Sequence, residues 1–353
     1  MATDASSGGA APGGLLADLV LEGGGVKGIA LSGAVATLAR AGYSFPRVAG
    51  TSSGAVVGAF LAALQRAGEP VERLEDVART LDYRRLRDRG AVGRAAGPLA
   101  RLVDGFSLAF DGGVFEGDYL RSWVRGALGD LGVHTFGDLR QDDPGSSLPP
   151  GERYSLLVTA SDVSRKRFVR LPWDYPLYGL DPDEQEVADA VRASASIPFF
   201  FEPVTLRSRA SAEGPAHVST LVDGGVLSSF PVSVFDRTDG VPPRWPTFGV
   251  RLSMRPGARS QTTEVRGTVS LALSLVETML EACDAQHIDD PCVQARSVFV
   301  DTGGISPVDF GITDEQQEQL LLAGHQAAGA FLAGWDWPAY LRRCRGYEQG
   351  QGA

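Results

Sequence analysis

The order of apolar segments and glycine-rich turns predicts an α/β protein with a mainly parallel central sheet and helices on both faces. Two observations carry this prediction. A short strand pattern ends in glycines and leads into an Ala/Leu-rich helix, and the same strand–turn–helix unit then repeats. Hydrophobic residues make up 43% of the 353 residues and charged residues 22%, which are ordinary values for a globular chain with a large core.

The two units occupy the first 70 residues. Ala17 to Glu22 reads as a strand, and Ile29 to Arg40 reads as a helix that closes at a glycine. Phe45 to Ala49 is the second strand. Ala55 to Ala67 is a helix that is apolar nearly all round, which predicts that it is buried.

The remaining chain shows further elements of both kinds. Thr313 and Gln316 make a capping box for a last helix, and residues 141–151 read as a polar loop. The other predicted strands are Ser155 to Ala160, Val218 to Val222, Thr247 to Leu252 and Ser297 to Asp301. A further helix is predicted from the spacing of Val269, Leu273, Val276, Leu280 and Cys283. The inward stripe of the last helix is predicted to be Leu320, Leu321, Gly324, Ala327, Ala328 and Phe331.

No loop separates two regions of different composition. We therefore expect one domain over residues 16–340, preceded by a flexible tail at 1–15 and followed by a polar tail at 341–353.

Net charge and cysteine content limit the classes of partner and the cellular compartment that the sequence allows. The net charge of −10 argues against a nucleic-acid partner. Three cysteines, Cys283, Cys292 and Cys344, are an odd count without a disulfide framework or a metal-binding spacing, which is typical of a reducing compartment. The N-terminus lacks the features of a signal peptide, and the longest apolar run is too short to span a bilayer. These features predict a cytoplasmic protein.

The first glycine cluster, at 23–28, reads Gly-Gly-Gly-Val-Lys-Gly and lies between a strand and a helix. It satisfies the G-x-G-x-x-G fingerprint, but the acidic residue that would hold a ribose is missing, since no Asp or Glu lies between Glu22 and Glu69. A nucleotide cofactor is therefore not expected. Successive backbone N–H groups at a helix start still make a site for an anion. The alternative is a turn that needs glycine only for tight packing.

The second cluster, at 50–54, reads Gly-Thr-Ser-Ser-Gly and again joins a strand to a helix. This is the context of a nucleophile elbow, in which a sharp turn lifts the central Ser52 clear of the sheet. Gly50 and Gly54 leave room for that turn. Ser53 is the rival nucleophile, one position late in the motif.

A serine nucleophile needs a base. His287 and His325 follow in the chain, but both fall in or beside predicted helices, and we interpret them as packing or surface residues. Asp223 is the better candidate, because it ends a predicted strand and is followed by Gly224 and Gly225. Active sites of open α/β sheets lie at such strand ends. The alternative for Asp-Gly-Gly is an ordinary turn.

Together these motifs resemble the patatin-like phospholipase family. The resemblance rests on Gly-Gly-Gly-x-Lys-Gly at 23–28, Gly-x-Ser-x-Gly at 50–54 and Asp-Gly-Gly at 223–225. The segments 193–203 and 301–310 also resemble that family, so the resemblance spans about residues 17–335. One departure is that Ser228 and Ser229 stand where the family often has Asn.

The resemblance implies a three-layer α/β/α fold and a Ser-Asp dyad that hydrolyses acyl esters of lipids without a metal or cofactor. Ser52 would be the nucleophile and Asp223 the general base. The oxyanion hole would consist of N–H groups of Gly23, Gly24 and Gly25, with Ser53 as a further donor. Lys27 and Gly28 match supporting positions of the glycine loop.

The expected activity is that of a phospholipase A or lysophospholipase. The alternatives are a neutral-lipid or small-ester esterase on the same site, and a regulated effector that is active only with a protein or small-molecule activator. Peripheral membrane contact is expected through a basic and apolar stretch at 83–110, which includes Arg84, Arg85, Arg87, Arg89 and Arg94. A solvated helix is the alternative for this stretch. A second basic cluster at 165–167 reads as a hairpin or a strand edge.

Overall fold

The computed structural model describes residues 14–86, 115–210, 214–253 and 289–347, together with residues 274, 275 and 278. Its centre is an eight-stranded sheet with the order β10-β9-β2-β4-β5-β8-β7, to which β6 is added beside β5. The strands are β1 Leu15–Leu16, β2 Asp18–Leu21, β3 Tyr43–Ser44, β4 Val48–Thr51, β5 Leu156–Asp162, β6 Arg167–Leu171, β7 Val204–Arg207, β8 Val218–Asp223, β9 Thr247–Arg251 and β10 Ser297–Phe299.

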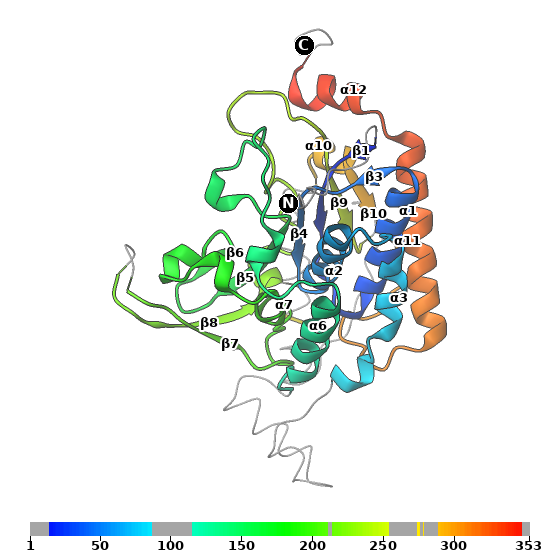
Figure 1. Ribbon diagram of the computed structural model, residues 1–353. Coiled ribbons are helices and arrows are strands. Elements are labelled where there is room, and N and C mark those ends of the chain that lie inside the picture. Colours follow the sequence, from blue (N-terminus) through cyan, green and yellow to red (C-terminus); the bar gives the residue numbers. More distant parts are fainter. Residues whose placement is uncertain are drawn as a thin grey trace, which may run out of the picture.

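The sheet is parallel from β10 to β5 and antiparallel at β6, β7 and β8. Helices cover both of its sides (Figure 1), which confirms the predicted α/β/α class. The α-helices are α1 Ile29–Arg40, α2 Ser53–Ala67, α3 Arg73–Thr80, α6 Asp118–Asp130, α7 Val187–Ser194, α10 Pro291–Ala295, α11 Asp314–Gly334 and α12 Trp337–Tyr340.

Both strand–turn–helix units are present. The predicted helix at 29–40 is α1, and its partner α2 packs on β4 and is buried along most of its length. The second strand begins later than predicted, at Val48, because the backbone of Phe45 is already bonded to the Gln65 side chain, at 2.8 Å and 2.9 Å. Pro46 follows and has no N–H to add to a ladder.

Helix α11 lies alongside α1 (Figure 1), and small residues allow the two helices to approach closely. A Cβ on Gly324 would stand 2.0 Å from the carbonyl oxygen of Ala30, and one on Gly33 would stand 2.3 Å from that of Leu321. The predicted capping box of α11 is formed by Thr313 and Gln316. Its predicted stripe is buried except at Ala327, which is partly buried.

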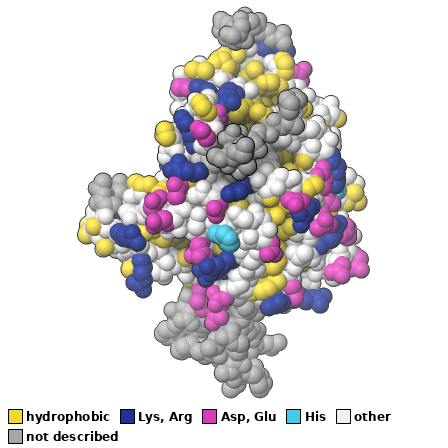
Figure 2. Space-filling model, viewed as in Figure 1, with side chains coloured by type: hydrophobic (Ala, Val, Ile, Leu, Met, Phe, Trp, Pro, Cys, Tyr) yellow, Lys and Arg dark blue, Asp and Glu magenta, His cyan; other side chains and the backbone are white. Residues whose placement is uncertain are grey.

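The structure describes one of the two predicted basic segments in full and only part of the other. Arg165 and Lys166 lie in the hairpin loop between β5 and β6, and Arg167 begins β6, as expected for a hairpin or a strand edge. Most of the stretch at 83–110 lies outside the described residues. So does most of the predicted helix at 269–283, of which residues 274, 275 and 278 are described and are helical. Of the stretch at 83–110, Arg84 and Arg85 are described, and the Arg85 guanidinium lies 4.3 Å from the ring centre of Tyr119. In the view of Figure 2, basic and acidic side chains are interspersed.

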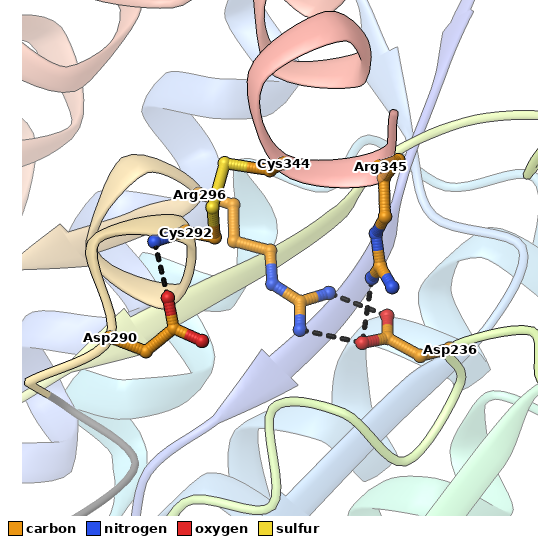
Figure 3. Close-up of a disulfide and its surroundings, with 6 residues drawn as sticks. All are labelled: Asp236, Asp290, Cys292, Arg296, Cys344 and Arg345. Atoms are coloured by element: carbon orange, nitrogen blue, oxygen red, sulfur yellow. Dashed lines mark hydrogen bonds and ion pairs between the residues drawn. A yellow bond between two sulfur atoms is a disulfide. The ribbon is translucent and has the colours of Figure 1, made fainter. Parts of the chain in front are cut away.

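The cysteine prediction requires a correction. Cys292 and Cys344 form a disulfide, with their Cα atoms 5.5 Å apart across 52 residues of sequence (Figure 3). This bond joins α10 to the π-helical turn η9, Leu341–Arg345, within the predicted C-terminal tail. Arg296 and Arg345 reinforce the junction by both binding Asp236 (Figure 3). Because two of the three cysteines are paired, the cysteine count does not support a reducing compartment. The pair depends on a tertiary contact, which the spacing of cysteines in the sequence does not show.

Candidate active site

The register of the sheet brings the two candidate catalytic residues together. Parallel β4 pairs with the first part of β5, up to Thr51 opposite Thr159. Antiparallel β8 pairs with the last part of β5, up to Asp223 opposite Ala160. Since β6 occupies the other edge of β5, β4 and β8 lie end to end along one edge. Their C-terminal ends meet at Thr159 and Ala160, so Ser52 and Asp223 become neighbours although 171 positions separate them.

Ser52 has the backbone of a nucleophile elbow. Its φ is 53° and its ψ is −120°, which is an uncommon conformation for a residue with a side chain. The turn requires glycine on both sides, since a Cβ on Gly50 would lie 2.2 Å from the carbonyl oxygen of Gly54. A Cβ on Gly54 would lie 2.3 Å from that of Leu21. Ser52 itself is 3% exposed, and its N–H donates to Ser194 Oγ at 2.8 Å.

Asp223 is fully buried at the end of β8. Its Oδ1 accepts a hydrogen bond from the N–H of Gly225 at 2.8 Å, and its Oδ2 accepts none within the part of the chain that the structure describes. Burial raises the pKa of Asp223 to about 7, while the Ser52 side chain and the Gly225 N–H favour the ionised form and limit that rise. A carboxyl group with this pKa is suited to accept a proton near neutral pH.

The glycine loop lies against the elbow. A Cβ on Gly28 would stand 2.5 Å from Ser53 Cβ, so the two glycine motifs touch. Gly25 has a φ of 55° and contacts Pro307, whose carbonyl oxygen accepts the N–H of Val26 at 3.0 Å. Lys27 lies in the 3-10 turn η1, Gly25–Gly28, and is partly exposed.

The three N–H groups expected to form an oxyanion hole differ in availability. The N–H of Gly23 donates to the carbonyl oxygen of Ser229 at 3.2 Å, and that of Gly24 donates to Ser53 Oγ at 3.1 Å. Gly25 opens η1 and Ser53 opens α2, where N–H groups have no acceptor within the helix. Within the described part of the chain, the N–H groups of Gly25 and Ser53 are therefore the candidates left for an oxyanion hole.

At 228–229, where the resembling family often has Asn, a serine of this chain makes the contacts to the glycine loop. Ser229 Oγ donates to the carbonyl oxygen of Gly23 at 3.4 Å, in addition to the bond from the Gly23 N–H. The Asp-Gly-Gly turn is closely packed as well, because a Cβ on Gly224 would lie 2.6 Å from Thr159 Oγ1. Ser229 thus braces the glycine loop in this chain.

An apolar cavity of about 80 Å³ opens beside Ser52. This is several times the roughly 10–15 Å³ that one water needs. Apart from Gly25, Gly28, Ser32, Ser52 and Ser53, its wall is mainly apolar. Representative wall residues are Val57, Phe60, Leu74, Leu86, Trp123 and Phe310.

The histidines are not part of this site as far as the structure describes them. His325 lies in α11, with Nδ1 2.8 Å from Thr37 Oγ1 and Nε2 3.5 Å from Glu75 Oε1. This agrees with its interpretation as a packing residue. His287 lies outside the described residues. Among the described residues, no group of three His, Cys, Asp or Glu side chains is placed to hold a metal ion.

Sequence reasoning missed the role of Ser194. In the sequence, Ser194 stands out only as part of the segment 193–203 that resembles the family. Ser194 ends α7, and its hydroxyl reaches the N–H of Ser52 across 142 residues of sequence. No local pattern signals such a contact.

Comparison with known proteins assigns the chain to a class. The family model described as "Patatin-like phospholipase" matches residues 19–236, and the chain belongs to this family. Membership supports a lipid acyl hydrolase in general terms. No helix among the described residues is long and apolar enough to cross a membrane.

Individual relatives are similar over most of the chain. The uncharacterized protein YqhO of Bacillus subtilis (strain 168) is 34% identical over 320 residues, covering 91% of this chain and 99% of that protein. The solved structure of VipD from Legionella pneumophila is 16% identical, with a TM-score of 0.45, over 92% of this chain and 67% of VipD. The type III effector ExoU of Pseudomonas aeruginosa is 17% identical, with a TM-score of 0.43, over 90% of this chain and 53% of ExoU. The chain thus spans about half of ExoU.

Proposed function

We propose that this protein is a serine-dependent lipid acyl hydrolase of the phospholipase A or lysophospholipase type, which uses Ser52 as nucleophile and Asp223 as general base. The observation that carries the proposal is the end-to-end meeting of β4 and β8, which places a strained Ser52 beside a buried Asp223. The family assignment supports the same chemistry.

The reaction begins when Ser52 Oγ attacks the ester carbonyl carbon and Asp223 accepts the hydroxyl proton. The carbonyl π electrons move to oxygen, and the N–H groups of Gly25 and Ser53 stabilise the oxyanion. Collapse expels the alcohol, which takes the proton from Asp223, and leaves an acyl group on Ser52. Water, deprotonated by Asp223, then attacks the acyl carbonyl carbon. The bond to Ser52 Oγ breaks, Asp223 returns the proton to Ser52 Oγ, and the fatty acid is released.

The cavity favours a substrate with an acyl chain over a short ester. Its wall includes Ser52 together with apolar side chains such as Leu74 and Leu86, and each buried methylene contributes about 0.8 kcal/mol to binding. A neutral-lipid ester would use the same wall.

The test compares phosphatidylcholine vesicles, a triacylglycerol emulsion and a short aryl ester as substrates. We expect wild type to release fatty acid and lysophospholipid from the vesicles, and Ser52→Ala to release neither. Ser219→Ala is the control, since Ser219 is equally buried and its hydroxyl bonds nothing among the described residues. Preference for the other two substrates would favour the esterase alternative, and hydrolysis that persists in Ser52→Ala would overturn the assignment.

A further inference from the structure

The end of α7 and the turn that follows it contact both members of the proposed dyad. Ser194 Oγ accepts the N–H of Ser52 at 2.8 Å, and the carbonyl oxygen of Ser196 accepts the N–H of Asp223 at 2.9 Å. Ser194, Ser196 and Asp223 are all fully buried. Two residues that are far apart in sequence are thus held by one short segment.

This segment is itself held by a buried arginine. Arg192 is 5% exposed, and its guanidinium donates to Ser196 Oγ and to the carbonyl oxygen of Glu202, the latter at 2.9 Å. Ser196 Oγ donates in turn to the carbonyl oxygen of Arg192 at 2.9 Å. A side chain at Gly117 would overlap Arg192, since a Cβ there would lie 2.3 Å from Nε. The turn therefore has little freedom to move.

The contact with Ser194 gives the buried N–H of the elbow residue Ser52 a hydrogen-bond acceptor. A buried N–H must find an acceptor, and leaving it unpaired costs about 1–3 kcal/mol. The positive φ of Ser52 adds a strain that persists only when the surroundings fix the conformation. Ser194 supplies the acceptor and so opposes relaxation of the strained peptide.

We propose that Ser194 is a positioning residue, whose hydroxyl holds the Ser52 backbone in the conformation that presents Oγ to Asp223. The proposal rests on the proposed function for its catalytic consequence, but the contact itself is independent of activity. Ser194 does not touch the reacting atoms. It acts through the Ser52 peptide, while the Ser196 carbonyl holds the facing strand end.

Kinetic measurements compare wild type with Ser194→Ala, Ser194→Thr and the control Ser219→Ala. We expect Ser194→Ala to lower kcat roughly 10- to 100-fold with KM within twofold, because a misplaced nucleophile impairs the transition state more than substrate binding. The acid limb of the pH–kcat profile of Ser194→Ala should move to higher pH, because the displaced Ser52 hydroxyl would no longer favour the ionised form of Asp223. Ser194→Thr, which keeps the hydroxyl, should restore much of kcat.

Two results would overturn the proposal: a Ser194→Ala protein with the wild-type kcat and pH profile, or an equal loss of kcat in Ser219→Ala. If Ser194→Ala does not fold, Ser194→Cys preserves the volume with a weaker acceptor. We then expect an intermediate kcat, and full kcat in a folded Ser194→Cys protein would contradict the inference.

Amide hydrogen exchange separates this proposal from the proposed function. The peptide that contains Ser52 should exchange faster in Ser194→Ala than in Ser219→Ala, whether or not the protein hydrolyses lipid. Faster exchange in a protein that shows no Ser52-dependent hydrolysis would support the Ser194–Ser52 contact but contradict the proposed hydrolase function. Unchanged exchange would reject the positioning role.

Discussion

At the scale of the residue, the surroundings of Asp223, the proposed general base, give an ordinary carboxyl group an unusual pKa. Burial disfavours the charged form, and only the Ser52 side chain and one backbone N–H offset it, so the pKa rises to about 7. A carboxyl group that is half ionised near neutral pH is available to accept a proton there, and its raised pKa makes it a stronger base than an ordinary carboxylate.

The first prediction concerns the pH dependence of catalysis. Asp223 must be ionised to accept the Ser52 proton, so kcat/KM should rise with pH and reach half its maximum near pH 7. The measurement is the initial rate of ester hydrolysis from pH 5 to pH 9 at low substrate concentration. A half-maximum near pH 4, where an exposed carboxyl titrates, would argue against Asp223 as the base.

The second prediction concerns stability. Between the unfolded pKa near 3.8 and the folded pKa near 7, the native state keeps a proton that the unfolded chain has lost. The free energy of unfolding therefore falls as pH rises through this window. Asp223→Asn does not ionise, so its Tm advantage over wild type should grow between pH 5 and pH 8.

Asp130→Asn is the control for that measurement, because it removes the same charge at an exposed position on α6. Thermal unfolding at pH 5 and pH 8 gives the comparison. Equal pH dependence in the two variants would show that ionising Asp223 does not destabilise the fold.

At the scale of the element, the elbow depends on how closely α2 approaches β2. Gly54 lies in the first turn of α2, and a side chain there would overlap the carbonyl oxygen of Leu21. Gly54→Ala should lower the free energy of unfolding by about 1–3 kcal/mol, because backbone atoms must move to admit the methyl group. Denaturant unfolding measures the change.

Gly126→Ala is the matched substitution in α6, where a Cβ would meet nothing within 4 Å. It should stabilise the protein by up to about 1 kcal/mol through helix propensity. Comparable destabilisation in both variants would mean that close approach at Gly54 is not the cause.

Elements with a clear local pattern were predictable from the sequence. The apolar stretch at 29–40 gave its helix at the correct bounds, and the Thr313 capping box located the start of α11. Ser52 and Asp223 were also identifiable as candidates, since each follows or ends a strand beside glycines. The end-to-end arrangement of β4 and β8 was not predictable, because strand order depends on long-range pairing rather than on local pattern. The same holds for Ser194, whose contact with Ser52 is tertiary.

At the scale of the whole molecule, the disulfide ties the C-terminal turn to α10, the short helix that precedes the edge strand β10 (Figure 3). A cross-link over 52 residues restricts the unfolded chain and typically stabilises a protein by about 2–4 kcal/mol. Cys344→Ser should therefore unfold at a lower denaturant concentration than wild type without reductant, and at a similar one with dithiothreitol present.

Cys283→Ser is the control for this comparison, because it leaves the Cys292–Cys344 pair intact. Its unfolding midpoint should fall with reductant as the wild-type midpoint does. Identical midpoints for wild type and Cys344→Ser without reductant would show that this cross-link does not stabilise the protein in solution.

The most direct test of the central claim is to identify the residue that reacts with a fluorophosphonate probe. The account predicts that Ser52 Oγ displaces fluoride, so that peptide mass spectrometry finds the phosphonyl group on Ser52 of wild type. Labelling should be absent in Ser52→Ala and strongly slowed in Asp223→Asn, which keeps the shape of the base but not its charge. A label on Ser53, or full labelling of Ser52→Ala, would contradict the Ser52–Asp223 dyad.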